Sequence, residues 1–196
     1  MSPQSEQPPP VVSSGTCEYS LIERQLLLRL AHDSIQAALD DRCLDLTSPS
    51  PHLSEPRGAF TTLHLRGLLR GCIGYVFPTE SLYKTVADTA RAAAFEDPRF
   101  ERVTPSEASQ LKVEISVLSP LQPIRADEVV VGKHGLVVTQ GSRRGLLLPQ
   151  VAIEWEWDRD TFLAQVCIKA GLAPDAWQQQ AELQGFTAEV FGEGEF

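Results

Sequence analysis

The sequence predicts an α+β fold with mostly antiparallel sheets, and three observations lead to that class. Apolar stripes at helical spacing occur in the same chain as segments in which apolar and polar residues alternate. Two strand segments are separated only by Arg66-Gly67, a dipeptide typical of a tight hairpin turn. Helical and strand segments follow one another without a regular strand–helix–strand order, which disfavours a parallel sheet.

Capping signals place two long helices in the first half of the chain. Ser20 and Glu23 form a capping box that begins a helix over 21–40. A second helix, rich in alanine, is expected over roughly 80–95. It ends before Asp97-Pro98, because the residue before a proline disfavours helical backbone.

The hairpin around Arg66-Gly67 joins strands at 59–65 and 68–76. A two-residue turn places Thr61 opposite Cys72. Cys72 and Arg70 then share one face of the sheet and His64 lies on the other, because side chains alternate along a strand. A three-residue loop would reverse this relation.

A short helix and a strand follow. Thr104 and Glu107 form another capping box, with Pro105 at the first helical position. The period-two alternation of Leu111–Val117 predicts a strand with one buried face, which Ser119-Pro120 ends.

The second half is expected to be rich in strands over 127–157, from Val129–Val131 through Leu146–Leu148. A helix at 159–170 follows, capped by Asp158 or Asp160 and ended by Gly171. Pro174 starts a short helical turn that contains Trp177, and Phe186–Phe191 reads as a final strand.

The chain is long enough for one domain after a short tail. It has 196 residues, of which 42% are hydrophobic and 22% charged, as in an ordinary globular protein. Residues 1–16 are rich in proline and predict a disordered tail, which leaves 17–196 as a single domain.

Charge and segment composition exclude several classes of protein. The formal net charge of −9 disfavours binding to nucleic acid, since no cluster of basic residues offsets it. No apolar run approaches the ~20 residues of a membrane span, and the first residues do not form a secretory signal. We therefore expect a cytoplasmic protein whose four cysteines are reduced thiols.

The segment Leu69-Arg70-Gly71-Cys72-Ile73-Gly74 stands out chemically, because two glycines bracket a cysteine in a predicted strand. Glycines in a strand mark a bulge or the close approach of another backbone or a ligand. Arg70 is a cation that would lower the pKa of the Cys72 thiol or bind a carboxylate. The alternative is a buried cysteine that acts as a small apolar side chain. No standard catalytic motif occurs, and the four isolated histidines predict no metal site.

The hexapeptide resembles the hallmark LRGCIG of the AMMECR-domain family, and other segments resemble further elements of that family in the same order. They include Asp97-Pro-Arg-Phe100, Val113-Glu-Ile-Ser-Val-Leu-Ser-Pro120, Gly132-Lys-His-Gly-Leu136, Gly145-Leu-Leu-Leu-Pro-Gln-Val151 and Cys167-Ile-Lys-Ala-Gly-Leu172. The resemblance covers roughly residues 18–192.

The resemblance implies two subdomains, each an antiparallel sheet with flanking helices, with a cleft between them. The larger would carry both chain ends, and Leu69, Arg70, Gly71, Cys72, Ile73 and Gly74 would face the cleft. The biochemical function of the family is regarded as unestablished, and its cofactors are unknown. Its prokaryotic members are often encoded beside, or fused to, a Memo-like protein and a radical-SAM protein, which implies these as partners.

Cys72 is the best nucleophile candidate, with Arg70 to tune it and His134 as a base if the fold brings it near. The alternative for His134 is a turn residue. Glu114 lies on the polar face of its strand and could reach the cleft, and its alternative is a side chain that faces solvent. Cys167 and the tryptophans are expected to pack in the core, and neither Arg99 nor Gln150 is expected to be catalytic.

Two functions remain open from the sequence. The first is a binding or accessory module that holds a protein or other large substrate in the cleft, together with the Memo-like or radical-SAM partner. The second is an enzyme that uses Cys72 with Arg70 for covalent or group-transfer chemistry, which requires a base or cation within hydrogen-bond reach of the sulfur.

Overall fold

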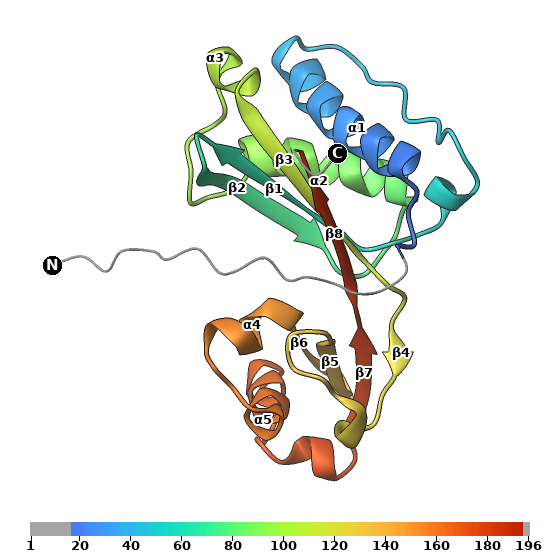
Figure 1. The fold of residues 1–196 in the computed structure, drawn as a ribbon. Coiled ribbons are helices and arrows are strands. Elements are labelled where there is room, and N and C mark those ends of the chain that lie inside the picture. The colour runs from blue at the N-terminus through green and yellow to red at the C-terminus, as the bar shows by residue number, and fades with distance from the viewer. Residues whose placement is uncertain (1–16, 194–196) are drawn as a thin grey trace, which may run out of the picture. The chain divides into compact units, whose positions relative to one another are not determined.

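The computed structural model describes residues 17–193 and divides them into two compact units (Figure 1). The first unit comprises 17–119 and 189–193, and the second comprises 120–188. Both ends of the described chain therefore belong to the first unit, and the chain passes between the units twice. Each unit contains one four-stranded antiparallel sheet with helices, so the α+β class with two subdomains is confirmed. The cleft between the subdomains stays a prediction, and the predicted tail lies outside the described residues.

The first unit is built on a sheet in the order β2-β1-β3-β8. Its strands are β1 (Ala59–Leu65), β2 (Leu68–Tyr75), β3 (Leu111–Leu118) and β8 (Ala188–Gly192). Its helices are α1 (Leu21–Leu39), α2 (Leu82–Phe95) and the short α3 (Pro105–Ala108), with a single 3₁₀ turn, η1, at His52–Ser54.

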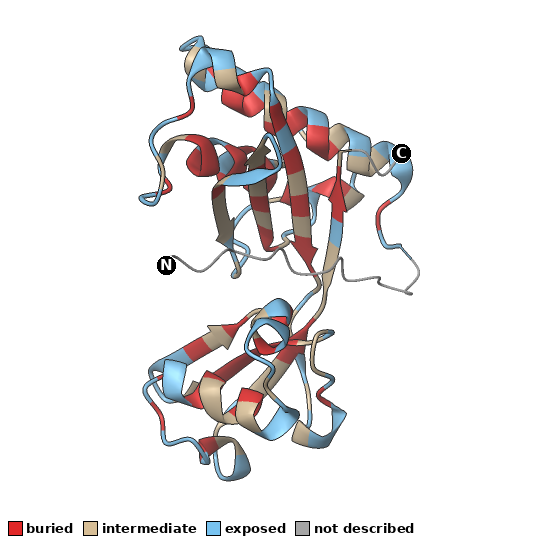
Figure 2. Ribbon diagram, turned by 60° about the vertical axis from the view of Figure 1, so that its left-hand side comes forward, coloured by how far each residue is buried: buried red, intermediate tan, exposed pale blue. Residues whose placement is uncertain are grey.

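Helices α1 and α2 pack on one face of this sheet, and that contact forms the core of the unit. Ala59, Thr61 and Leu63 of β1 are fully buried on that face, and the Thr61 and Thr89 hydroxyls form a hydrogen bond of 2.8 Å between β1 and α2. The many alanines of α2 permit this close approach, because they add little side-chain volume. The alternation of buried and partly buried residues along the strands is visible in Figure 2.

The second unit has the sheet order β4-β7-β5-β6. Its strands are β4 (Gln122–Pro123), β5 (Gly135–Gln140), β6 (Arg143–Leu147) and β7 (Glu182–Phe186). Helices α4 (Pro149–Glu154) and α5 (Arg159–Lys169) and the 3₁₀ turns η2 (Ala126–Glu128) and η3 (Ala176–Gln178) complete it. The core joins the apolar stripe of α5, including Phe162 and Cys167, to Leu136 and Val138 of β5.

Most elements expected from local signals form. The Ser20 and Thr104 capping boxes are present, and Asp158, not Asp160, caps α5. The turn at Arg66 and Gly67 has positive φ at both residues, as a tight two-residue hairpin turn requires.

Three expectations for the second half are wrong. Val129–Val131 does not form a strand and follows the short η2 turn as a loop. Residues 149–154 form helix α4, because Pro149 occupies the first helical position, where its missing N–H costs nothing. The single final strand expected at Phe186–Phe191 is two strands, β7 and β8, which belong to different sheets.

None of the helices in residues 17–193 combines the length and the apolar character that crossing a membrane requires.

Candidate functional site

The hairpin of β1 and β2 contains a bulge that changes which residue lies opposite Cys72. The strands pair from Leu65 and Leu68 at the turn, but the register shifts between Leu63 and His64. Arg70 is the extra residue, since His64 pairs with Leu69 and Leu63 pairs with Gly71. Thr62, rather than Thr61, is therefore the partner of Cys72, and the predicted register is wrong by one residue.

The shift also moves His64 onto the face that carries Cys72, which corrects the expectation that it lies on the other face. This face is opposite the one that packs on α1 and α2, and we call it the Cys72 face. Its residues are Phe60, Thr62 and His64 of β1, Leu69, Cys72 and Gly74 of β2, and Lys112, Glu114 and Ser116 of β3.

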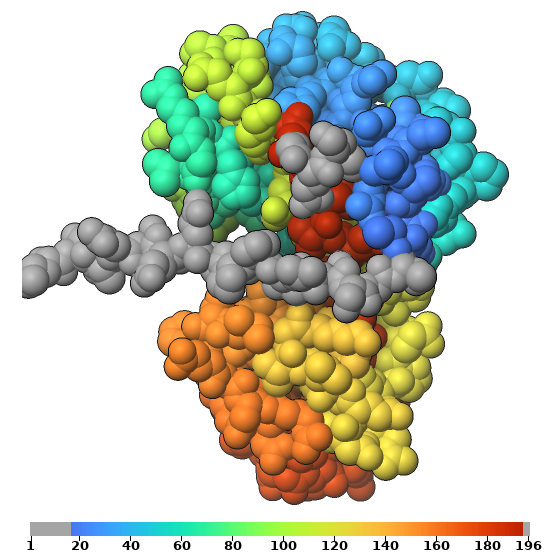
Figure 3. Space-filling view, in the orientation of Figure 1, coloured from blue at the N-terminus to red at the C-terminus, as the bar shows by residue number. Residues whose placement is uncertain are grey.

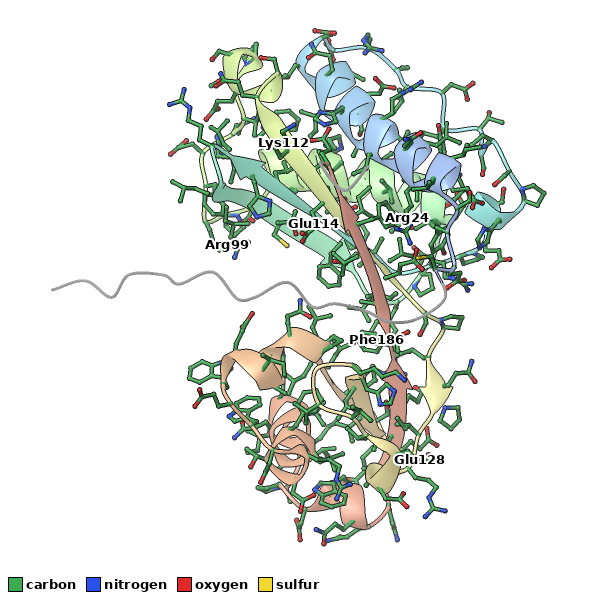
Figure 4. All side chains as sticks on the ribbon, in the orientation of Figure 1. Arg24, Arg99, Lys112, Glu114, Glu128 and Phe186 are labelled. Atoms are coloured by element: carbon green, nitrogen blue, oxygen red, sulfur yellow. The ribbon has the colours of Figure 1, made fainter. Side chains whose placement is uncertain are left out.

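Polar side chains form a row across three strands of the Cys72 face. Thr62 lies directly opposite Cys72 on one side and Glu114 on the other. All three residues are half-buried. Figure 4 shows Glu114 and Lys112 on β3 and Arg99 near the edge of the sheet. A thiol, a hydroxyl and a carboxylate thus lie side by side on three neighbouring strands.

The Cys72 thiol has a hydroxyl as its hydrogen-bond partner. The Thr62 Oγ1 donates to the Cys72 Sγ at 3.3 Å. A hydroxyl that donates to the sulfur does not accept the thiol proton. Among the described residues no histidine or carboxylate is hydrogen-bonded to this sulfur.

Asp97 and Arg99 hold the backbone of Cys72 at the open edge of β2. The Cys72 N–H donates to the Asp97 Oδ2 at 2.9 Å, and the Arg99 Nη2 donates to the Cys72 carbonyl at 3.3 Å. Because β2 is an edge strand, these backbone groups have no neighbouring strand to pair with. The two side chains take the place of that strand and block the edge.

Asp97 and Arg99 also form a close ion pair with each other. Arg99 donates to Asp97 through Nη2 at 2.7 Å, Nε at 3.0 Å and its backbone N–H at 3.1 Å. Hydrogen bonds from the Arg99 side chain, aided by the Cys72 N–H, hold the pKa of the buried Asp97 carboxyl well below its usual range. Asp97 therefore stays ionised and fixes Arg99 beside Cys72.

Arg70 has a carboxylate partner within the protein. Its Nε and Nη2 donate to the two Glu107 oxygens at 3.1 and 3.2 Å, and its Nη1 donates to the Glu101 carbonyl at 2.7 Å. These bonds lower the pKa of Glu107 to about 2, with the hydrogen bond from Arg70 as the largest cause. The arginine bonded to Cys72 is Arg99, and a role of Arg70 toward a ligand stays a prediction.

The two glycines of the hexapeptide are explained by close contacts inside the protein. A Cβ at Gly71 would collide with the Ala93 carbonyl of α2, so the helix backbone approaches the strand there. A Cβ at Gly74 would collide with the Phe60 ring, which lies over it on the Cys72 face. The glycines therefore allow tight packing on both sides of Cys72.

His134 belongs to the second unit, whereas Cys72 belongs to the first. Its Nδ1 accepts from the Val130 backbone N–H at 3.1 Å, and the His134 backbone N–H donates to the Val130 carbonyl at 3.0 Å. Burial lowers the pKa of the imidazole, and Lys133 lowers it further. His134 is thus part of a turn, and its proposed role as a base stays a prediction.

Solvent exposure shows the environment of the other cysteines and of Trp155. Cys167 is fully buried in the core of the second unit, as expected, and burial raises the pKa of its thiol. Cys17 and Cys43 are exposed, and all four cysteines are free. Trp155 is 66% exposed, contrary to the expectation that the tryptophans pack in the core. No group of three or more metal-ligating side chains occurs within 17–193.

The sequence reasoning missed Thr62 and the edge-blocking role of Asp97 and Arg99. The bulge that brings Thr62 to Cys72 leaves no signal in the apolar pattern. Asp97 and Arg99 did have a signal, because Asp-x-Arg after a helix suits a local bidentate ion pair.

One family profile matches most of the chain, and related proteins and a solved structure are similar to nearly all of it. The sequence profile of the AMMECR1 family matches residues 28–191. Protein Mbar_A1807 of Methanosarcina barkeri is 41% identical over 185 residues, which covers 89% of this chain and 92% of that protein. Protein MK0488 of Methanopyrus kandleri is 39% identical over 90% of this chain and 91% of its own length. The crystal structure of the uncharacterised protein PH0010 from Pyrococcus horikoshii matches with a TM-score of 0.71 and 39% identity, over 86% of this chain and 90% of that chain.

Proposed function

The chain belongs to the AMMECR1 family, and we propose that it is a binding module that uses the Cys72 face to hold a protein or other large ligand. The family resemblance supplies the expected partners, a Memo-like protein and a radical-SAM protein. One observation carries the choice of binding over catalysis: the hydrogen-bond partner of the Cys72 sulfur is the Thr62 hydroxyl rather than a base.

The charged groups around Cys72 support this choice. Arg70 is bound by Glu107 and Arg99 by Asp97, so both cations are used to hold the protein together. An activated cysteine needs a base or an unpaired cation beside the sulfur. A sheet face that presents a hydroxyl, a thiol and a carboxylate side by side is instead suited to recognition of a polar partner surface.

A charge reversal on the Cys72 face tests the proposal. The purified chain is titrated with the Memo-like and the radical-SAM protein encoded in the same genome, by calorimetry. Glu114→Arg places a cation in the centre of the face and is expected to weaken binding at least tenfold. Glu182→Arg changes an exposed strand glutamate in the other unit and serves as the matched control.

The proposal predicts binding by the wild type and by Glu182→Arg, with loss only in Glu114→Arg. If neither protein binds the wild type, the partner assignment is wrong. If both variants bind as the wild type does, the partner binds elsewhere and the Cys72 face is not the site.

A cysteine-dependent enzyme is the second candidate, because the Thr62 hydroxyl donates to the sulfur and Arg99 is bonded to the same residue. The test is the pH dependence of thiol labelling at Cys72, with the exposed Cys17 and Cys43 replaced by serine. Rapid labelling below pH 7 that slows in Arg99→Ala or Arg70→Ala would favour the enzyme. An ordinary thiol profile in all three proteins would favour the binding module.

A further inference from the structure

A turn after helix α4 presents a tryptophan to solvent. The Trp157 N–H donates to the Ala152 carbonyl at 2.8 Å, and the Glu156 N–H donates to the Ile153 carbonyl at 3.1 Å. This is the Schellman pattern of hydrogen bonds that ends a helix. Glu156 occupies its left-handed position, with φ of 52°, where glycine is usual. The backbone around Trp155 is therefore fixed by hydrogen bonds.

The ring of Trp155 packs against a second aromatic ring. Its ring stacks on that of Trp157, with centroids 6.1 Å apart and an interplanar angle of 19°. Trp157 packs against the core of the second unit, whereas Trp155 is 66% exposed. Ile153, on the last turn of α4, is 44% exposed. We call Ile153, Trp155 and Trp157 the Trp155 platform; Figure 3 shows the orange surface formed by α4, α5 and the segment between them.

Acidic residues flank the platform residues in the sequence. Glu154 and Glu156 are exposed on either side of Trp155, and no ion pair within 17–193 engages them. Asp158 caps α5, and Asp160 lies 3.6 Å from the Nε of Arg159. Arg159 is the only basic residue in 154–160, and it is already bonded to Asp160 and to the Asp127 carbonyl. Residues 154–160, which contain Trp155 and Trp157, therefore carry a net negative charge.

We propose that the Trp155 platform is a docking site for a lysine- or arginine-bearing segment of a partner protein. An exposed indole face attracts an ammonium or guanidinium group, and tryptophan is the residue type that most often dominates a protein interface. Glu154 and Glu156 supply the charge that complements such a segment and steers its approach. The site lies wholly within 120–188, so it is tested independently of the Cys72 face.

The charges argue against other occupants. A second copy of this chain would bring the same carboxylates to the same place, and like charges at an interface oppose association. A nucleic acid would bring phosphates and would be repelled for the same reason. A basic polypeptide satisfies both the indole and the carboxylates.

The test uses a fluorescein-labelled peptide of alternating lysine, arginine and alanine, titrated with the full chain at 50 mM salt. The wild type is expected to bind saturably and to quench its tryptophan fluorescence. Trp155→Ala is expected to weaken binding at least tenfold, and Trp155→Leu, which keeps apolar area without a π face, at least fivefold. Glu154→Gln with Glu156→Gln is expected to weaken binding and reduce its salt dependence. Asp175→Asn with Glu182→Gln removes two exposed charges elsewhere in the same unit and is expected to bind within twofold of the wild type.

Several outcomes overturn the proposal. Absence of saturable binding to the wild type excludes the docking site, and so does equal binding by folded Trp155→Ala. If the Glu154→Gln with Glu156→Gln variant and the Asp175→Asn with Glu182→Gln variant lose affinity equally, the peptide is attracted to the overall negative charge rather than to the platform. Self-association of the wild type in sedimentation, abolished by Trp155→Leu, assigns the platform to a second copy of the chain instead.

Discussion

Asp97→Asn is expected to destabilise the first unit and to release the backbone of Cys72. The wild-type carboxylate accepts four hydrogen bonds, three from Arg99 and one from the Cys72 N–H. An amide offers one acceptor oxygen and turns an NH₂ group toward the donors that remain. The variant therefore leaves at least one of these donors unpaired at a side chain that is 2% exposed.

The expected loss of stability depends on how far the Asp97 and Arg99 side chains are buried. Removing one partner of a fully buried ion pair costs about 3–5 kcal/mol. Arg99 is 55% exposed, so water recovers part of its solvation when Asp97 is lost. We therefore expect a loss of about 2–4 kcal/mol in the free energy of unfolding, between the value for a buried pair and that for a surface pair. For a chain of this size each kcal/mol shifts Tm by about 2–4 °C.

A matched control exists in the second unit. Arg125 and Asp127 form the same bidentate pair, at 2.9 and 2.8 Å and also two residues apart, but their side chains are 75% and 63% exposed. Asp127→Asn is expected to cost far less stability than Asp97→Asn, because water screens an exposed pair. Urea unfolding measures both variants, and hydrogen exchange of the Cys72 amide reports the edge of β2 directly.

The effect should also depend on pH. The pKa of Asp97 is lowered in the folded state, so its contribution is present above the unfolded pKa, about 3.9, and is lost as the pH falls below it. The difference between wild type and Asp97→Asn should be constant between pH 5 and 7 and shrink below pH 4. Equal destabilisation by Asp97→Asn and Asp127→Asn, or unchanged exchange at Cys72, would refute this reasoning.

Three other predictions follow from the same region and from the second core. Gly71→Ala is expected to lower the free energy of unfolding in urea by at least about 2 kcal/mol, because the added Cβ meets the Ala93 carbonyl and a helix backbone cannot easily move away. A smaller loss would show that the strand and the helix do not approach so closely. Glu107→Gln frees Arg70 and should lower stability at pH 7 but not at pH 2, since the wild-type carboxylate loses its contribution between about pH 4.5 and 2. In thiol labelling of the native protein, Cys167 should react far more slowly than the two exposed cysteines, because it is buried and its pKa is raised; labelling at equal rates would show that the core of the second unit opens readily.

Local chemistry made much of the fold predictable. The caps at Ser20, Thr104 and Asp158 satisfy backbone groups within three residues, so their signals lie in short segments of sequence. Helix α4 had such a signal in Pro149, but the apolar residues before it resemble a strand. Short apolar runs do not separate helix from strand by periodicity, and the flanking proline decides between them.

Long-range pairing was not predictable in the same way. Residues 186–191 read as one strand because each half favours extended backbone. They form β7 and β8, which pair in different sheets on either side of Thr187. Sheet membership depends on strands far away in the sequence, and a pattern within six residues carries no information about them.

The candidate site depends on a bulge that the strand glycines indicated but whose position the apolar pattern does not give. A bulge of one residue at Arg70 separates the part of the hairpin set by the turn from the part that carries Cys72. Side chains alternate with a period of two, so this single insertion exchanges the faces of every later pair. It places His64 and Thr62 with Cys72 and brings the row of Cys72, Thr62 and Glu114 together. The chemistry of the Cys72 face therefore depends on Arg70 lying outside the pairing, because a regular hairpin that paired Arg70 with Leu63 would place Thr61, rather than Thr62, opposite Cys72.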